Sequence, residues 1–153
     1  MIKLKKTIVM VAMSGALAIS GIAGITASTQ ASSTDPIPNT SNTGFSHNNS
    51  SSAVNHSDWR VKNNTTKVYI YPTTGPTIYY RVLGKKNKGD AASERSEQVK
   101  IPKGVQASVT NWAKESGDNW VQLRMARVSS NSTKTTGWWS PDSTKNYDVY
   151  PKK

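Results

Sequence analysis

The alternation of apolar and polar residues from Trp120 to Met125 constrains this chain more than any other feature. Every second residue of Trp-Val-Gln-Leu-Arg-Met is aliphatic or Met, as expected for a strand with one buried face. The turn signal Ser-Gly-Asp-Asn at 116–119 precedes this segment, so we predict a hairpin. Four of the five tryptophans lie between Trp112 and Trp139, so this region is expected to supply much of the buried aromatic area.

Similar short alternating segments occur along much of the chain. They cover residues 59–62, 67–71, 77–83, 98–101, 105–109, 137–139 and 147–150, and Gly, Pro, Asn and Ser separate them. Residues 85–96 have no apolar stripe and are predicted to form a polar loop rather than a helix. The pattern predicts an all-β domain, a small antiparallel β-sandwich, with a small barrel as the alternative.

The N-terminal third of the chain is expected to lie outside this domain. Lys3, Lys5 and Lys6 precede an apolar run with many small residues, which is typical of a secretory signal peptide cut after Ala31. A membrane anchor is the alternative, but the Gly, Ala and Ser content favours removal, after which no membrane span is expected. Residues 32–57 are rich in Ser, Thr and Asn and are predicted to be a disordered polar arm. Residues 58–153 are predicted to form a single β domain.

Charge and the absence of cysteine narrow the class of protein. Removing residues 1–31 takes three of the 20 basic residues and none of the nine acidic ones, so 17 basic residues remain and the formal charge is +8. The chain has no cysteine, which excludes disulfides, thiolate metal sites and the lipid-attachment cysteine of bacterial lipoproteins. We expect a protein that is secreted and is either released or retained on the cell wall.

The predicted domain lacks the residues that most hydrolases need. Residues 58–153 contain neither His nor Cys, so His-dependent triads, Cys nucleophiles and ordinary zinc sites are not available. His47 and His56 lie in the predicted arm and are interpreted as solvated. The acidic pairs at 94/97 and 115/118 have the composition of a glycosidase pair, but they lie in a polar loop and at a turn. Ser140 to Ser143 has the composition of a turn. We therefore predict no catalytic residue, metal or cofactor.

Basic and aromatic residues are the better candidates for binding. A basic extracellular domain meets polyanions such as teichoic acid. Four of the aromatic residues are expected on strand faces opposite the aliphatic rows, as a ladder for sugar rings or nucleobases or, alternatively, as part of the core. The predicted ligand-binding residues are Tyr69, Tyr71, Tyr79, Lys85, Lys86, Lys88, Trp120 and Arg124.

The chain also resembles two known groups of proteins. Trp59-Arg60-Val61, Val121-Gln122-Leu123-Arg124 and Gly137-Trp138-Trp139-Ser140-Pro141-Asp142 resemble, in order and spacing, a family of small secreted proteins of Gram-positive bacteria with no assigned function. Lys103-Gly104, Asn119-Trp120-Val121 and Thr136-Gly137-Trp138 are more weakly similar to bacterial SH3-like cell-wall modules, which implies an SH3-like barrel as the alternative fold.

The sequence therefore predicts a secreted, non-enzymatic, basic β-domain. We expect it to bind an anionic or glycan component of the bacterial cell envelope, such as teichoic acid or peptidoglycan. The alternative is a secreted bacteriocin-like antimicrobial protein, which its charge would draw to the anionic surface of competing cells. A small hydrolase acting on the wall is disfavoured because residues 58–153 contain no histidine.

Overall fold

A computed structural model describes residues 36–51, 53–145 and 147–153, and these residues form an all-β domain without helices. The described residues contain no helix that is long and apolar enough to cross a membrane. The predicted signal peptide, residues 1–31, lies outside it. The strands are β1 (Thr43–Asn48), β2 (Val54–His56), β3 (Arg60–Val61), β4 (Val68–Thr74), β5 (Ile78–Lys85), β6 (Ser93–Glu94), β7 (Val99–Ile101), β8 (Ala107–Val109), β9 (Trp120–Arg127), β10 (Lys134–Ser140) and β11 (Asp148–Tyr150).

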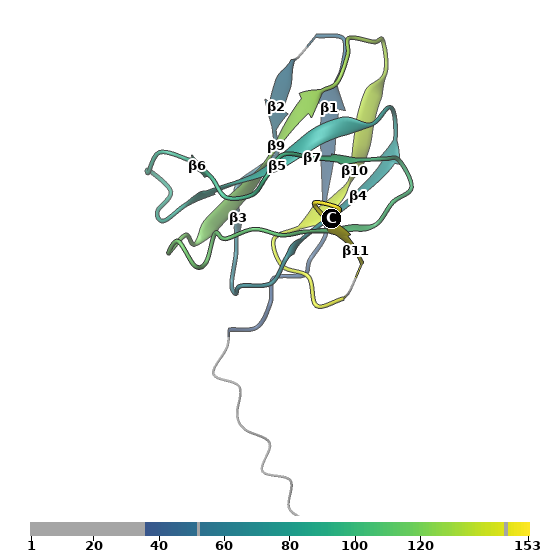
Figure 1. Ribbon diagram of the computed structural model, residues 1–153. Helices are drawn as coiled ribbons and strands as arrows, with labels where there is room; N and C mark the ends of the chain where they lie inside the picture. The colour runs from purple at the N-terminus through teal and green to yellow at the C-terminus, as the bar shows by residue number, and fades with distance from the viewer. Residues whose placement is uncertain (1–35, 52, 146) are drawn as a thin grey trace, which may run out of the picture. The chain divides into compact units, whose positions relative to one another are not determined.

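The strands form two sheets. The five-stranded sheet has the order β1-β10-β4-β8-β11 and is antiparallel except where β11 pairs with β8. The six-stranded sheet has the order β2-β9-β5-β6, with β3 also pairing with β9 and β7 with β5. In Figure 1, β5 and β9 of one sheet cross β1 and β10 of the other. The fold is therefore the predicted β-sandwich.

One core joins the inner faces of the two sheets. Ile70 and Trp139 contribute from the five-stranded sheet, and Tyr80 and Leu123 contribute from the six-stranded sheet. The rings of Phe45 and Tyr80 meet edge to face across the sandwich, with centroids 5.6 Å apart. The aliphatic alternation predicted for residues 77–83 and 120–125 is confirmed, because the aliphatic side chains of these two segments are buried in β5 and β9.

The predicted hairpin at residues 116–119 is wrong, although the turn exists. Gly117 has a φ of 81°, and the Asp118 N–H donates to the Ala113 carbonyl to close the turn. The strands on either side belong to different sheets, since β8 pairs with β4 and β11 while β9 pairs with β5. β5 is long enough to pair with β9 over eight residue pairs, with most of the buried residues of both strands on the same side. β8 has only three residues and cannot form such a long pairing.

The ordered domain begins earlier than predicted. Residues 32–57 were expected to be a disordered arm and residues 58–153 the domain, but β1 and β2 lie within that arm. β1 pairs with β10 over six residues and turns Phe45 and His47 into the core. Backbone pairing with a neighbouring strand depends little on side-chain polarity, so two inward side chains are enough to order a polar segment.

Candidate functional site

The outer side of the six-stranded sheet carries five of the eight predicted ligand-binding residues. Paired residues of neighbouring strands project to the same side of a sheet. Arg81 of β5 is opposite Arg124 of β9, which is opposite His56 of β2. In another row, Lys85 is opposite Trp120. We name this surface the cationic face and define it by His56, Trp59, Tyr79, Arg81, Lys85, Lys88, Lys100, Trp120 and Arg124.

Three lysines of the cationic face lie over aromatic rings. Lys85 Nζ is 4.1 Å from the ring centroid of Trp59, and Lys88 Nζ is 4.9 Å from that of Trp120. The third such contact joins Lys100 to Tyr79, at 5.0 Å. An ammonium group over an aromatic ring is attracted by the ring quadrupole. The rings therefore help to hold these lysines against the sheet.

The arginines of the cationic face differ in their partners. Arg81 forms an ion pair with Glu94 of β6, whereas no carboxylate in the described part of the chain forms an ion pair with Arg124. Burial, together with the positive charge of Arg124, lowers the pKa of His56 below its ordinary value of 6.5. His56 is therefore neutral at pH 7, and the positive charge of this row comes from the arginines.

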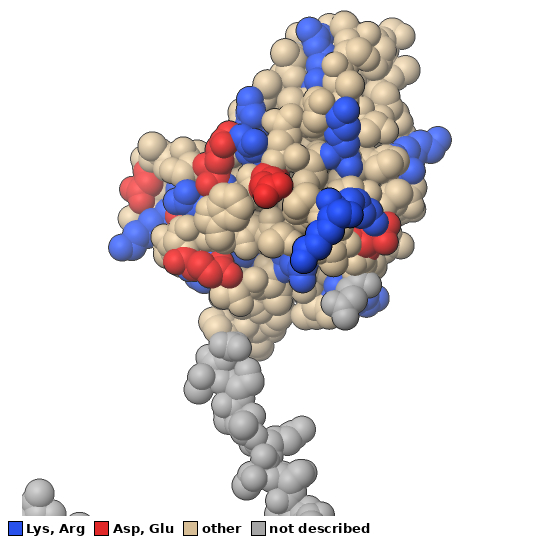
Figure 2. All heavy atoms as spheres, viewed as in Figure 1, with Lys and Arg blue, Asp and Glu red and all other residues tan. Residues whose placement is uncertain are grey.

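Positive charge is spread over the face seen in Figure 2 rather than gathered in one block. Figure 2 shows lysine and arginine side chains distributed over the face in view, with fewer carboxylates between them. The whole chain has 20 basic residues and nine acidic ones, which explains this excess. The cationic face is consequently distinguished by the three lysines that lie over its aromatic rings rather than by a concentration of charge.

The remaining predicted residues lie elsewhere. Tyr69 and Tyr71 belong to β4 of the five-stranded sheet, so the prediction of one aromatic ladder with Tyr79 and Trp120 is wrong. The alternation was correct on each strand, but the strands belong to two sheets that share one core. Lys86 is exposed in the loop after β5, where its carbonyl accepts a hydrogen bond from the Asn119 side chain.

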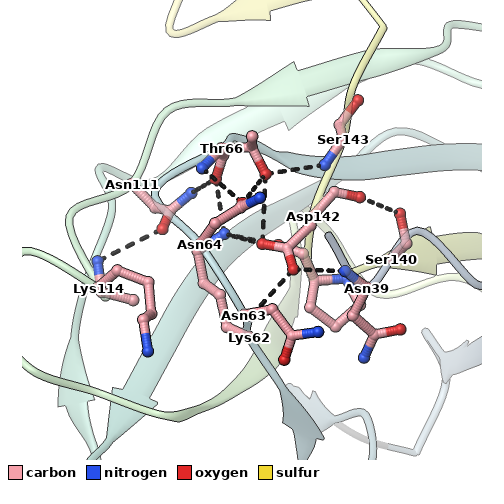
Figure 3. Close-up of polar contacts among 12 residues, drawn as sticks. Asn39, Lys62, Asn63, Asn64, Thr66, Asn111, Lys114, Ser140, Asp142 and Ser143 are labelled. Atoms are coloured by element: carbon pink, nitrogen blue, oxygen red, sulfur yellow. Dashed lines mark hydrogen bonds and ion pairs between the residues drawn. The ribbon is translucent and has the colours of Figure 1, made fainter. Parts of the chain in front are cut away.

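A buried ion pair, shown in Figure 3, lies where β10 ends. Lys62 Nζ donates to Asp142 Oδ1 at 2.8 Å, and both side chains have no exposed surface. The same ammonium group donates to the carbonyls of Thr66 and Pro141. Asp142 Oδ1 also accepts from the Thr66 hydroxyl, and Oδ2 accepts from the backbone N–H groups of Asn39 and Asn63. We name this group the Lys62–Asp142 cluster.

The Lys62–Asp142 cluster is interpreted as a structural feature rather than a catalytic site. All three protons of the ammonium group have acceptors, and both carboxylate oxygens have donors, which is the condition for burying such a pair. Burial lowers the pKa of Lys62, and the hydrogen bond to Asp142 opposes this shift. The cluster joins the segment before β1, the loop after β3 and the end of β10. Sequence reasoning interpreted Asp142 only as a turn residue.

The histidines do not form a metal site in the described residues. No group of three or more His, Asp or Glu side chains there is placed to hold a metal ion. His47 was expected to be solvated, which is wrong: it projects inward from β1 and is fully buried. Burial and the positive charge of Arg127 lower its pKa below 6.5.

Comparison with known families places the chain in one of them. The model of the family described as "Protein of unknown function (DUF2712)" matches residues 28–143. The chain belongs to this family. The matched region of the DUF2712 family contains β1 to β10, the whole cationic face and the Lys62–Asp142 cluster. No curated protein and no solved structure matches the chain. The predicted membership of an uncharacterised family is confirmed, while the Gram-positive origin and the SH3-like resemblance stay predictions.

Proposed function

We propose that this member of the DUF2712 family is a secreted, non-enzymatic β-domain that binds an anionic polymer or glycan of the bacterial cell envelope. Teichoic acid, a polymer of polyol units joined by phosphodiester groups, is the favoured ligand, and the cationic face is the proposed binding surface. The observation that carries this proposal is the row of Arg81 and Arg124 on neighbouring strands, flanked by three lysines held on aromatic rings.

The geometry of the sheet suits a polymer rather than a single small anion. Neighbouring strands lie about 4.8 Å apart, and residues two apart along a strand are separated by about 7 Å. Cations at this spacing can contact successive phosphates of one chain. Arg124 is half-buried and has no ion-pair partner among the described residues, so it is available to a ligand anion. A guanidinium group can bind a phosphate through two parallel hydrogen bonds.

The proposal is tested by retention of the purified protein on Gram-positive cell walls with and without teichoic acid, over a series of salt concentrations. Exposed charge–charge contacts weaken as salt rises, so we expect retention that needs teichoic acid and is lost at high salt. Retention that persists at high salt, or that is equal on walls stripped of teichoic acid, would contradict the proposal.

A pair of matched lysine variants locates the surface. Lys100 on β7 and Lys134 on β10 are both exposed strand lysines, but only Lys100 belongs to the cationic face. We expect Lys100→Gln to weaken retention, further in combination with Arg124→Gln, and Lys134→Gln to have little effect. Equal losses from Lys100→Gln and Lys134→Gln would show that net charge alone causes retention, and would reject the cationic face as a site.

A further inference from the structure

The outer side of the five-stranded sheet presents a second group of aromatic residues. Gly44, Trp138 and Tyr71 form one row across β1, β10 and β4. Trp138 is 49% exposed and Tyr71 is half-buried. A Cβ atom at Gly44 would lie 3.9 Å from Cζ3 of Trp138, so the indole extends over the glycine of the neighbouring strand. The sheet therefore carries a large, exposed aromatic surface at this row.

A pocket of about 250 Å³ lies beside this row. Ser140 and Tyr69, two residues from Trp138 and Tyr71 on the same strands, line the pocket and occupy the next row of the sheet. Tyr147 closes one side, with its ring centroid 4.8 Å from that of Tyr69. Residues two apart on a strand are separated by about 7 Å, so one elongated ligand can contact both the pocket and the Trp138 ring.

The chemistry of this surface differs from that of the cationic face. Hydroxyl and amide groups predominate in the pocket lining, which includes Thr40, Asn42 and Ser143, and Lys145 contributes one cationic side chain at its edge. Asp142 also lines it, but its carboxylate has no exposed surface and four hydrogen bonds already occupy its oxygens. Within the described residues, no Lys or Arg is placed over the rings of Trp138 or Tyr71. The rings are therefore open to an uncharged ligand.

We propose that this surface binds an uncharged saccharide chain. The apolar C–H face of a sugar ring stacks on Trp138 and Tyr71, because such rings offer rigid apolar area at low entropic cost. The hydroxyl groups of the neighbouring sugar unit then pair with the hydroxyl and amide groups of the pocket. This saccharide site is on the sheet opposite the cationic face and does not depend on the function proposed for that face.

The test is calorimetric titration of the purified protein with an uncharged tetrasaccharide of N-acetylglucosamine and with a panel of other neutral oligosaccharides. We expect binding to at least one of them that is unchanged at high salt. Trp138→Ala should weaken that binding by about tenfold or more, equivalent to about 1.4 kcal/mol. Trp112→Ala is the matched control, since Trp112 is 43% exposed but lies in the loop between β8 and β9.

A second variant separates the ring surface from the fold. Gly44→Leu should displace the indole without removing it, because its side chain would occupy the position over which Trp138 extends. We expect weaker binding and an unchanged unfolding midpoint. The proposal is overturned by the absence of binding to every neutral saccharide, or by binding that Trp138→Ala and Gly44→Leu leave intact. Failure of this test would leave the salt-dependent retention on teichoic acid unaffected.

Discussion

Removing one partner of the buried Lys62–Asp142 pair should destabilise the domain severely. Lys62→Met leaves the Asp142 carboxylate buried with two backbone N–H groups and one hydroxyl, and Asp142→Leu leaves an ammonium group facing two carbonyls. An uncompensated buried charge costs about 3–5 kcal/mol. The total stability of a domain is only about 5–15 kcal/mol, so each variant should remain folded by a small margin at most.

Urea unfolding followed by tryptophan fluorescence measures this loss. With a slope of about 2 kcal/mol per molar urea, a cost of 3–5 kcal/mol lowers the midpoint by about 1.5–2.5 M. The double variant Lys62→Met/Asp142→Leu should lose clearly less than the sum of the two single variants, because it leaves no unpaired charge.

The exposed pair of Lys152 and Asp148 is the control for this experiment. Both of its side chains are 57% exposed, and Asp148→Asn should cost less than about 1 kcal/mol. Single Lys62 and Asp142 variants that cost no more than this control, or that are strictly additive in the double variant, would refute the structural role of the cluster.

Two further predictions concern Gly137 and His47. Gly137→Ala should cost about 3 kcal/mol or more, measured by thermal unfolding, because its Cβ would lie 2.2 Å from the Tyr71 carbonyl oxygen and 2.7 Å from Phe45. Gly89→Ala, with no atom within 4 Å of its Cβ, should be nearly neutral, and an equal loss in both would contradict the steric argument. The unfolded chain binds a proton at His47 below about pH 6.5 more readily than the folded protein does, so stability should fall as pH drops below 6.5. His47→Gln should lose less stability between pH 7.5 and pH 5 in urea unfolding, and an identical pH dependence would refute the role of His47.

The strands of the fold were predictable where burial imposes a period of two on the sequence. β5 and β9 have aliphatic or aromatic residues at alternate positions, and both were predicted. β1 was not, because its inward side chains are one phenylalanine and one histidine in an otherwise polar segment. Its order comes from pairing with β10, whose paired residues lie between 86 (Asn48 to Lys134) and 96 (Thr43 to Trp139) positions further along the chain. The composition of the β1 segment alone therefore does not indicate that it has a partner strand.

The candidate site was predictable only in its residue types. Basic and aromatic residues on polar faces were identified, but strand order decides which of them meet. Arg81 and Arg124 become neighbours through the pairing of β5 with β9, while Tyr71 and Tyr79, eight residues apart, lie on different sheets. The partnership of Lys62 with Asp142 spans 80 residues, and no local pattern in the sequence indicates it.

The two proposed binding surfaces should differ in their response to salt. Three rings of the cationic face have lysines over them, whereas, within the described part of the chain, Trp138 and Tyr71 on the five-stranded sheet do not. Contacts between exposed charges weaken as salt rises, but stacking on an uncharged ring does not. On the two proposals above, a wall polymer with anionic and neutral sugar segments would contact one surface whose binding weakens as salt rises and one whose binding does not. Loss of Arg124 should then matter at low salt, and loss of Trp138 should matter at high salt.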